Sequence, residues 1–307
     1  MKIGIALAAY QPVPRYFAEQ LASLQAQEHE DWVCSVRFDS PSTVMTEPLL
    51  SPFVSDARFT WTENPTRLGS TKNFERAIAD VVGRGAAFVA CADQDDVWDR
   101  EKLAVSLAAL RDTPLGLVHA DVRILGADGR TGAQTAWELE ARNVDRAEPL
   151  DLLVRNVVTG AAMLFDAELA RRFPIIPEGA RFHDHWFAIV ASLHGGVRPI
   201  RRALSAWRQH DTNLVGLRKF GGYFSRPNMG GGRLEGCDVA WARAEALLGA
   251  IREAKLPLAQ RDEEVFTRPD LGLRLARLAA RNFSVDRVLS RHCLALAIGK
   301  ARASRSE

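Results

Sequence analysis

Three carboxylates within four residues, Asp93, Asp95 and Asp96, form the strongest chemical signal in this chain. They directly follow the apolar run 86–92, which has the composition of a buried strand. Carboxylates this close repel one another. A divalent cation such as Mg²⁺ or Mn²⁺ would relieve that repulsion and could also bind the phosphates of a substrate. The spacing leaves an alternative open, a solvated acidic turn before a helix that starts near Asp99.

A carboxylate flanked by two histidines, Asp184, stands at the start of a helix predicted over 182–193. His183 and His185 are two positions apart and do not share a helix face, so they make a poor pair of metal ligands. Asp184 could act as a general base if it faces a cleft. It could equally serve only to stabilise the helix N-terminus. The residues alone do not decide between these two roles.

Three further polar side chains are weaker candidates. His210 lies in the polar run 207–213, where a neutral imidazole could complete a metal site or contact phosphate. A lone histidine in a loop is more commonly only solvated. Lys72 and Asn73 open a helix predicted over 70–82, where backbone N–H groups and a cation could bind phosphate. Lysines at helix starts are also commonly just solvated.

The elements that would position these groups alternate between apolar strands and amphipathic helices. This order predicts an α/β fold, a largely parallel sheet with both faces covered. Ligands of such sheets bind beyond the carboxyl ends of the strands, where both Asp39 and the cluster that starts at Asp93 lie. The expected strands are Ile3–Ala9, Trp32–Phe38, 58–62, 86–92, 115–125 and 157–165, and the expected helices are 16–27, 70–82, one from about 150, and 182–193.

The composition of the chain changes after Gly216, where a Gly-rich loop precedes Arg-rich helical sequence. We therefore divide the chain into a main domain, 1–216, and a C-terminal region, 217–307. Residues 271–307 carry eight Lys and Arg but only two acidic residues. They could form a helix that covers the main domain with a solvated basic side, or an interfacial helix attracted to anionic lipid.

Overall composition excludes several classes of protein. With 47% hydrophobic and 25% charged residues, the 307-residue chain is typical of globular proteins. Its 40 Lys and Arg nearly balance 38 Asp and Glu, so charge does not indicate a nucleic-acid partner. No apolar run approaches the ~20 residues that span a bilayer. The first ten residues fit a buried strand better than a secretion signal, and four cysteines without CxxC spacing favour a reducing cytoplasm over a disulfide framework.

Taken together, residues 1–216 resemble a family 2 glycosyltransferase. The resemblance implies the nucleotide-sugar-binding GT-A fold, a Rossmann-like, mostly parallel or mixed sheet flanked by helices, here with a helical C-terminal extension. DQDDVW together with RQHxxN is a specific combination, and it most resembles bacterial enzymes, often called rhamnosyltransferases, that build cell-surface polysaccharide. The matching segments are Ala8-Ala9-Tyr10, the helix 16–27, the strand ending at Asp39, Asn64 with RLGSTKNFERAI (67–78), DQDDVW (93–98) with Lys102-Leu103, VTGA (158–161), HDHW (183–186) and WRQHDTNLVG (207–216).

The resemblance also implies roles for individual residues. The DxD motif, which holds Mn²⁺ or Mg²⁺ against the donor diphosphate, matches Asp93 and Asp95, with Asp95 the more direct ligand. His210 matches a later polar residue that reaches the metal or the diphosphate, and Asp184 matches the catalytic base. The residues implied on the donor side are Ala9, Tyr10, Asp39, Lys72, Asn73, Asp93, Gln94 and Asp95, with Asp39 at the nucleotide base. Those implied on the acceptor side are Gly160, His185 and Trp186.

One position departs from the family pattern. Relatives usually have Asp-Asp-Gly-Ser where this chain has Phe38-Asp39-Ser40-Pro41. Recognition of the nucleotide base is therefore expected to differ from that of relatives.

The sequence predicts a cytoplasmic, inverting, metal-dependent glycosyltransferase with no nucleic-acid partner. It would move a sugar, rhamnose by resemblance, from a dTDP- or UDP-linked donor to a glycan, expected to be lipid-linked, with peripheral contact at the inner membrane face. Such a transfer needs a base on the acceptor hydroxyl and a Lewis acid on the departing diphosphate. A rival class, the sugar nucleotidyltransferases, would need a Gly-rich basic loop where this chain has 8–12 (AAYQP). The other rival is a non-catalytic nucleotide-sugar-binding subunit, against which the retained carboxylates and His210 argue.

Overall fold

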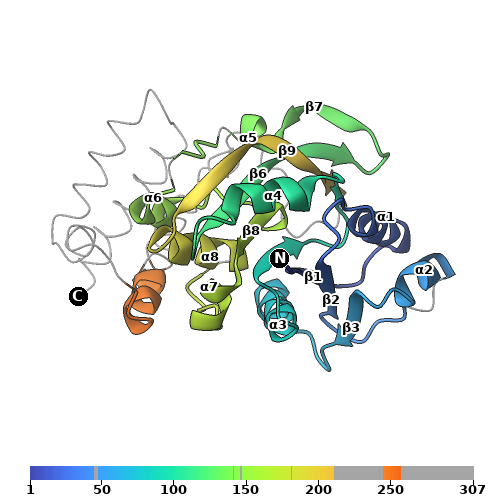
Figure 1. Ribbon diagram of the computed structural model, residues 1–307, viewed down its shortest axis with the longest axis horizontal. Helices are drawn as coiled ribbons and strands as arrows, with labels where there is room; N and C mark the ends of the chain where they lie inside the picture. The colour runs from blue at the N-terminus through green and yellow to red at the C-terminus, as the bar shows by residue number, and fades with distance from the viewer. Residues whose placement is uncertain are drawn as a thin grey trace, which may run out of the picture.

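The structure, a computed structural model, describes most of the main domain and one helix of the C-terminal region (Figure 1). The described residues are 1–44, 48–140, 142–145, 147–180, 182–210, 242 and 245–256. The predicted Gly-rich loop and the basic segment 271–307 lie outside them. The division at residue 216 therefore stays a prediction.

The described strands form a single mixed sheet in the order β3-β2-β1-β4-β8-β6-β9-β5, with β7 paired to β6. The strands from β3 to β4 are parallel, β8 runs antiparallel to both neighbours, and β9 runs parallel to β6. The predicted fold class, an α/β sheet flanked by helices, is thus confirmed. The strands are β1 (Ile3–Ala9), β2 (Trp32–Phe38), β3 (Phe59–Glu63), β4 (Phe88–Ala92), β5 (Val97–Trp98), β6 (Leu117–Gly126), β7 (Thr131–Thr135), β8 (Met163–Asp166) and β9 (Val197–Gln209).

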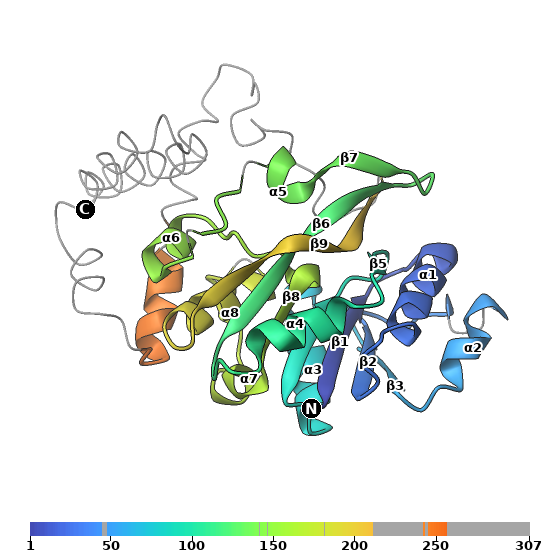
Figure 2. The same ribbon diagram turned by 45° about the horizontal axis from the view of Figure 1, so that its top comes forward.

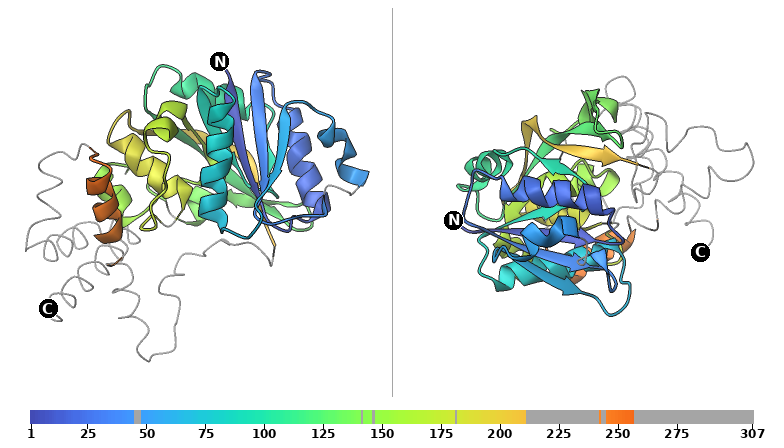
Figure 3. Two further views of the ribbon diagram at one scale, coloured as in Figure 1. Left: turned by 90° about the horizontal axis from the view of Figure 1, so that it is seen from below. Right: turned by 90° about the vertical axis from the view of Figure 1, so that its right-hand side faces the viewer.

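Helices cover both faces of the sheet (Figure 2). One apolar cluster joins α1 and α4 to alternate residues of β1, and a second joins α3, α7 and α8 to the opposite face. Seen from below, α3 lies along the parallel strands (Figure 3). No helix in the described ranges is long and apolar enough to cross a membrane. The helical elements are α1 (Pro14–Gln25), η2 (Pro48–Leu50), α2 (Ser51–Val54), α3 (Ser70–Gly83), α4 (Lys102–Leu110), α5 (Ala136–Leu139), α6 (Pro149–Val154), η3 (Gly160–Ala162), α7 (Ala167–Arg172) and α8 (His183–Ser192).

Local sequence accounts for the helices that flank the parallel strands. Pro14 opens α1 because its fixed φ suits the first helical position, where its missing N–H costs nothing. Phe17, Leu21 and Leu24 then recur at helical spacing and are buried against the sheet. In the C-terminal region, the helix 245–253 adds its apolar side chains to the cluster that contains α3 and α8.

The structure corrects one predicted strand and adds others. The strand predicted over 157–165 is wrong in its first half, where η3 precedes the short strand β8. The backbone N–H of Gly160, in η3, donates to Asp184 Oδ2 at 3.1 Å instead of to a neighbouring strand. The sequence did not predict β9, because Pro199 and four arginines break its alternation, nor the two-residue β5 that pairs with it.

Candidate active site

The predicted donor-side residues gather where the parallel strands end. Tyr10 follows β1, Asp39 follows β2 and Asp93 follows β4, all at the carboxyl edge of the sheet. Two hydrogen bonds join these ends. The backbone N–H of Asp39 donates to Ala9 O at 2.8 Å, and that of Tyr10 donates to Gln94 Oε1 at 2.7 Å. The edge is therefore one connected surface.

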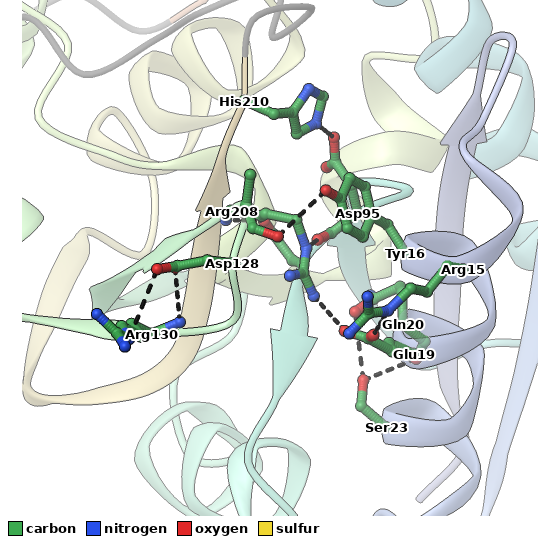
Figure 4. A network of polar contacts seen from close by, with 12 residues as sticks. Arg15, Tyr16, Glu19, Gln20, Ser23, Asp95, Asp128, Arg130, Arg208 and His210 are labelled. Atoms are coloured by element: carbon green, nitrogen blue, oxygen red, sulfur yellow. Dashed lines mark hydrogen bonds and ion pairs between the residues drawn. The ribbon is translucent and has the colours of Figure 1, made fainter.

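Asp95 and His210 meet at this edge, although they are far apart in the sequence (Figure 4). The pairing of β5 with β9 sets Val97 opposite Ala206 and so brings the end of β9 beside the turn after β4. Nε2 of His210 lies 2.7 Å from Oδ2 of Asp95, and the two side chains are only 11% and 14% exposed. The structure thus brings together two of the three predicted metal ligands.

This pair fits a divalent cation that a substrate helps to hold. A carboxylate oxygen and an imidazole nitrogen are both metal ligands in proteins. Among the residues that the structure describes, no group of three His, Cys, Asp or Glu side chains is placed to hold a metal, so Asp93 does not complete a three-ligand site. A cation here would take its other ligands from water and substrate phosphates, which is how Mg²⁺ is usually bound.

Asp93 and Asp184 lie close to each other and to Asp95. The pKa of Asp93 is raised to about 7, first because burial disfavours its charged form and then because the carboxylates of Asp95 and Asp184 repel it, while Lys102 opposes the shift. The charge of Asp184 therefore acts on Asp93, so the predicted base shares the electrostatic environment of the acidic cluster. These are the carboxylates that the sequence placed in separate motifs.

Asp184 is held in place by η3. Its Oδ2 accepts a hydrogen bond from the backbone N–H of Gly160 at 3.1 Å, and its Oδ1 accepts one from the N–H of His185 at 2.6 Å. Only glycine fits at position 160, because an added Cβ would lie 2.6 Å from His183 Nε2. Asp184 lies in the first turn of α8, but the N-cap residue is Phe182.

The predicted residues Asp39 and Asn73 shape the loop before α3. Asp39 is buried and accepts hydrogen bonds from the backbone N–H of Leu68, at 2.8 Å, and of Gly69, at 2.9 Å. Gly69 has φ +87°, a conformation that favours glycine. Asn73 is also buried and donates to Arg37 O at 2.9 Å. The roles of Asp39 and Asn73 toward a donor stay predictions.

Phe38, the residue at which this chain departs from the pattern of the resembled family, lies in the apolar core. Its buried ring stacks on Trp61, with centroids 6.4 Å apart, and meets Phe17 edge-on at 6.0 Å. The side chain therefore packs under α1, whereas the neighbouring Asp39 binds the loop before α3.

Contacts within the protein engage the side chains of Lys72, His185 and Trp186. Nζ of Lys72 donates to Glu75 Oε2 at 2.8 Å and to Ile176 O at 3.2 Å. Nε2 of His185 lies 2.8 Å from Leu152 O. Trp186 is only 2% exposed and belongs to the apolar cluster of α8, so the structure gives it a packing role.

Comparison of the sequence with models of known protein families shows the family of the chain. The family model described as glycosyl transferase family 2 matches residues 5–172. The chain belongs to this family. It is a glycosyltransferase. A comparison with curated proteins by sequence found no match.

Solved structures show the same fold. S. aureus TarS 1–349 in complex with UDP-GlcNAc has a TM-score of 0.54 at 13% identity, over 100% of this chain and 92% of TarS 1–349. The mannosyltransferase PcManGT from Pyrobaculum calidifontis, in complex with GDP-Man and Mn²⁺, has a TM-score of 0.52 at 13% identity, over 99% of this chain and 86% of PcManGT. At this identity the likeness extends to the fold alone.

Two cations of this glycosyltransferase were not assigned from the sequence. Lys102, in the first turn of α4, is buried beside the acidic cluster and donates to Ala161 O in η3. Its pKa is lowered to about 7, because burial outweighs the attraction of Asp96 and other acidic groups. Arg208 is equally buried and contacts the turn that carries Asp95. Both residues lie in segments that the family resemblance covers, Lys102 shortly after DQDDVW and Arg208 within 207–216, but neither received a role from the sequence.

His183 makes the stability of the fold depend on pH. It is buried against Phe74, with ring centroids 3.7 Å apart, and burial lowers its pKa to about 3. Below the unfolded-state pKa of about 6.5, only the unfolded chain binds the proton, so stability is lost as the pH falls. We expect the parent to lose about 2 kcal/mol more than His183→Phe between about pH 7.5 and about pH 5.

Urea unfolding at the two pH values measures this difference. The half-buried His29 offers a control, since His29→Gln removes an imidazole whose hydrogen bonds to backbone oxygens are exposed. An equal loss in the parent and in His183→Phe would contradict the assignment of the effect to His183.

Proposed function

We propose that this glycosyltransferase is inverting and metal-dependent, and that it transfers a sugar from a nucleotide-diphosphate donor to a glycan. The observation that carries the proposal is the contact between Asp95 and His210 at the carboxyl edge of the sheet, with Asp184 close enough to raise the pKa of Asp93. A cation-binding pair and a base that serve one reaction centre are what an inverting transfer requires.

The proposed donor end of the site combines residues that follow β1, β2 and β4 with His210, which follows β9. Asp95 and His210 would hold Mn²⁺ or Mg²⁺, which when bound supplies a Lewis acid for the departing diphosphate. Asp93 adds a second carboxylate close to Asp95. Tyr10 and Asp39, joined to the same edge by backbone hydrogen bonds, would contact the nucleoside.

The acceptor end is built around Asp184. With Oδ2 fixed by the N–H of Gly160, its carboxylate would orient the acceptor hydroxyl and take its proton as the new glycosidic bond forms. Attack on the face opposite the leaving diphosphate inverts the anomeric centre and needs no covalent intermediate. Gly160 acts here through Asp184, which assigns it a positioning role.

The finer identity of the substrates rests on the sequence. The subgroup resemblance favours rhamnose from a dTDP- or UDP-linked donor and a lipid-linked acceptor in bacterial cell-surface polysaccharide synthesis. Such an acceptor would place the enzyme in the cytoplasm at the inner membrane face. The basic segment 271–307 would then bind anionic lipid there.

Thermal unfolding of the purified protein with a panel of nucleotide sugars, each with and without Mn²⁺, tests the proposal. A donor at 100 times its Kd is expected to add about 2.7 kcal/mol, or roughly 5 °C, and only when Mn²⁺ is present. A shift with dTDP-rhamnose and not with UDP-glucose would support the rhamnosyl assignment.

Two outcomes would contradict parts of the proposal. An equal shift without a divalent cation would remove the metal dependence. A folded protein that responds to no donor in the panel would favour the non-catalytic binding subunit over the enzyme proposed here.

A further inference from the structure

Helix α1 carries two side chains that contact Arg208 (Figure 4). Glu19 Oε2 accepts a hydrogen bond from the Arg208 guanidinium, and the ring of Tyr16 lies against the same group, with 4.4 Å between the ring centroid and the guanidinium carbon. Tyr16 and Glu19 are three positions apart on α1 and so share a helix face. The guanidinium is therefore bound by a carboxylate and covered by an aromatic ring, both from α1.

Arg208 connects this helix face to the proposed cation site. Its Nε donates to the backbone oxygen of Asp95 at 2.9 Å, and its backbone N–H donates to Asp96 Oδ1 at 3.2 Å. The same residue thus binds α1, the turn that carries Asp95, and the end of β9 that carries His210. Its side chain is only 2% exposed, so it has little freedom to find other partners.

Tyr16 also contacts the imidazole of the cation-binding pair. Its ring lies 5.6 Å from that of His210, centroid to centroid, at an interplanar angle of 28°. One aromatic ring therefore lies against both Arg208 and His210. Because two planar groups pack on this ring, its removal would free both.

We propose that Tyr16 and Glu19 are positioning residues for the cation-binding pair of Asp95 and His210, Glu19 through Arg208 and Tyr16 through Arg208 and through its own contact with the His210 ring. The inference rests on the proposed metal-dependent function. Glu19 acts in two ways. It fixes the guanidinium that holds the Asp95 backbone, and its negative charge offsets a buried positive charge beside a site meant for a cation. Without Glu19, the positive charge of the buried Arg208 would be less compensated and would repel the metal more strongly.

Mn²⁺ binding to the full-length chain, followed by the electron paramagnetic resonance signal of free Mn²⁺, tests the inference without any turnover. We expect Glu19→Gln, which keeps the shape of the side chain, to weaken Mn²⁺ affinity about tenfold, the effect typical of a partner that orients a metal ligand. Asp95→Ala is expected to remove the binding. A merely structural role for Glu19 would lower the thermal midpoint and leave the Mn²⁺ affinity of the folded protein unchanged.

The same helix provides a matched control. Arg15 pairs with the other oxygen of Glu19, Nε to Oε1 at 3.1 Å, but its side chain is 74% exposed. Because exposed ion pairs contribute little, Arg15→Gln should bind Mn²⁺ within about twofold of the parent. Tyr16→Phe keeps the ring and should retain affinity, whereas Tyr16→Leu should lose it.

The outcomes separate this inference from the proposed function. If the parent and Asp95→Ala bind Mn²⁺ equally, the cation site itself is wrong and the proposed metal dependence fails with it. If Asp95→Ala loses the binding but Glu19→Gln and Tyr16→Leu bind as the parent does, the site stands and only the positioning role is overturned.

Discussion

Replacing Asp184 with asparagine is expected to lower kcat for sugar transfer by between about 10² and 10⁴, the usual contribution of a general base. The amide oxygen of asparagine can still accept the hydrogen bond that Gly160 N–H donates to Asp184 Oδ2, so the local structure should persist. What the amide lacks is a lone pair basic enough to take the proton of the acceptor hydroxyl. Steady-state transfer, measured with the donor that the thermal panel identifies, gives the ratio directly.

Two comparisons make this result specific to the base. The donor-induced thermal shift of Asp184→Asn should equal that of the parent, because the substitution leaves the proposed donor site at Asp95 and His210 unchanged. Asp112, whose side chain is 87% exposed, provides the control Asp112→Asn, which should transfer sugar at the parental rate. Parental turnover in Asp184→Asn would instead assign the proton to another group.

The sequence predicted the parallel half of the fold well, because its signals are local. In β1 and β4 a short apolar run is buried on both faces, and in α3 apolar residues recur at helical spacing. The strand β9 carries no such pattern. It forms because long-range pairing with β6 stabilises it, with register shifts near Ala120 and Asp121, and residue types alone do not encode such a partner.

The candidate site also has one part that local sequence predicted and another that depends on long-range contacts. Its acidic groups were predicted from short motifs. The contact between Asp95 and His210, however, depends on the pairing of β5 with β9, and the sequence linked these two residues only through the family resemblance. Lys102 and Arg208 went unassigned for another reason. Lysine and arginine are almost never fully buried unless they are paired, so sequence reasoning gives them solvated positions by default. Their partners, Ala161 O and Glu19, come from distant elements.

Asp95→Ala is expected to abolish the Mn²⁺-dependent part of donor binding, the second large effect. The substitution removes one of the two proposed protein ligands and leaves His210 without the carboxylate that lies 2.7 Å from its Nε2. At a donor concentration that stabilises the parent by about 2.7 kcal/mol, the Mn²⁺-dependent increment in the thermal midpoint, roughly 5 °C, should vanish. Gln94→Ala would lose only the hydrogen bond from Tyr10 N–H and should keep part of that increment.

The metal-free protein should tolerate Asp95→Ala better than His210→Ala. Both substitutions remove the 2.7 Å contact between Asp95 and His210, but only Asp95→Ala also removes the charge that repels Asp93 and contributes to its raised pKa. At about pH 8, above the raised Asp93 pKa of about 7, the thermal midpoint without Mn²⁺ should therefore be higher in Asp95→Ala than in His210→Ala, while Asp95→Ala loses the response to donor. A lower metal-free midpoint together with an intact Mn²⁺ response would mean that Asp95 supports the fold and that the cation binds elsewhere.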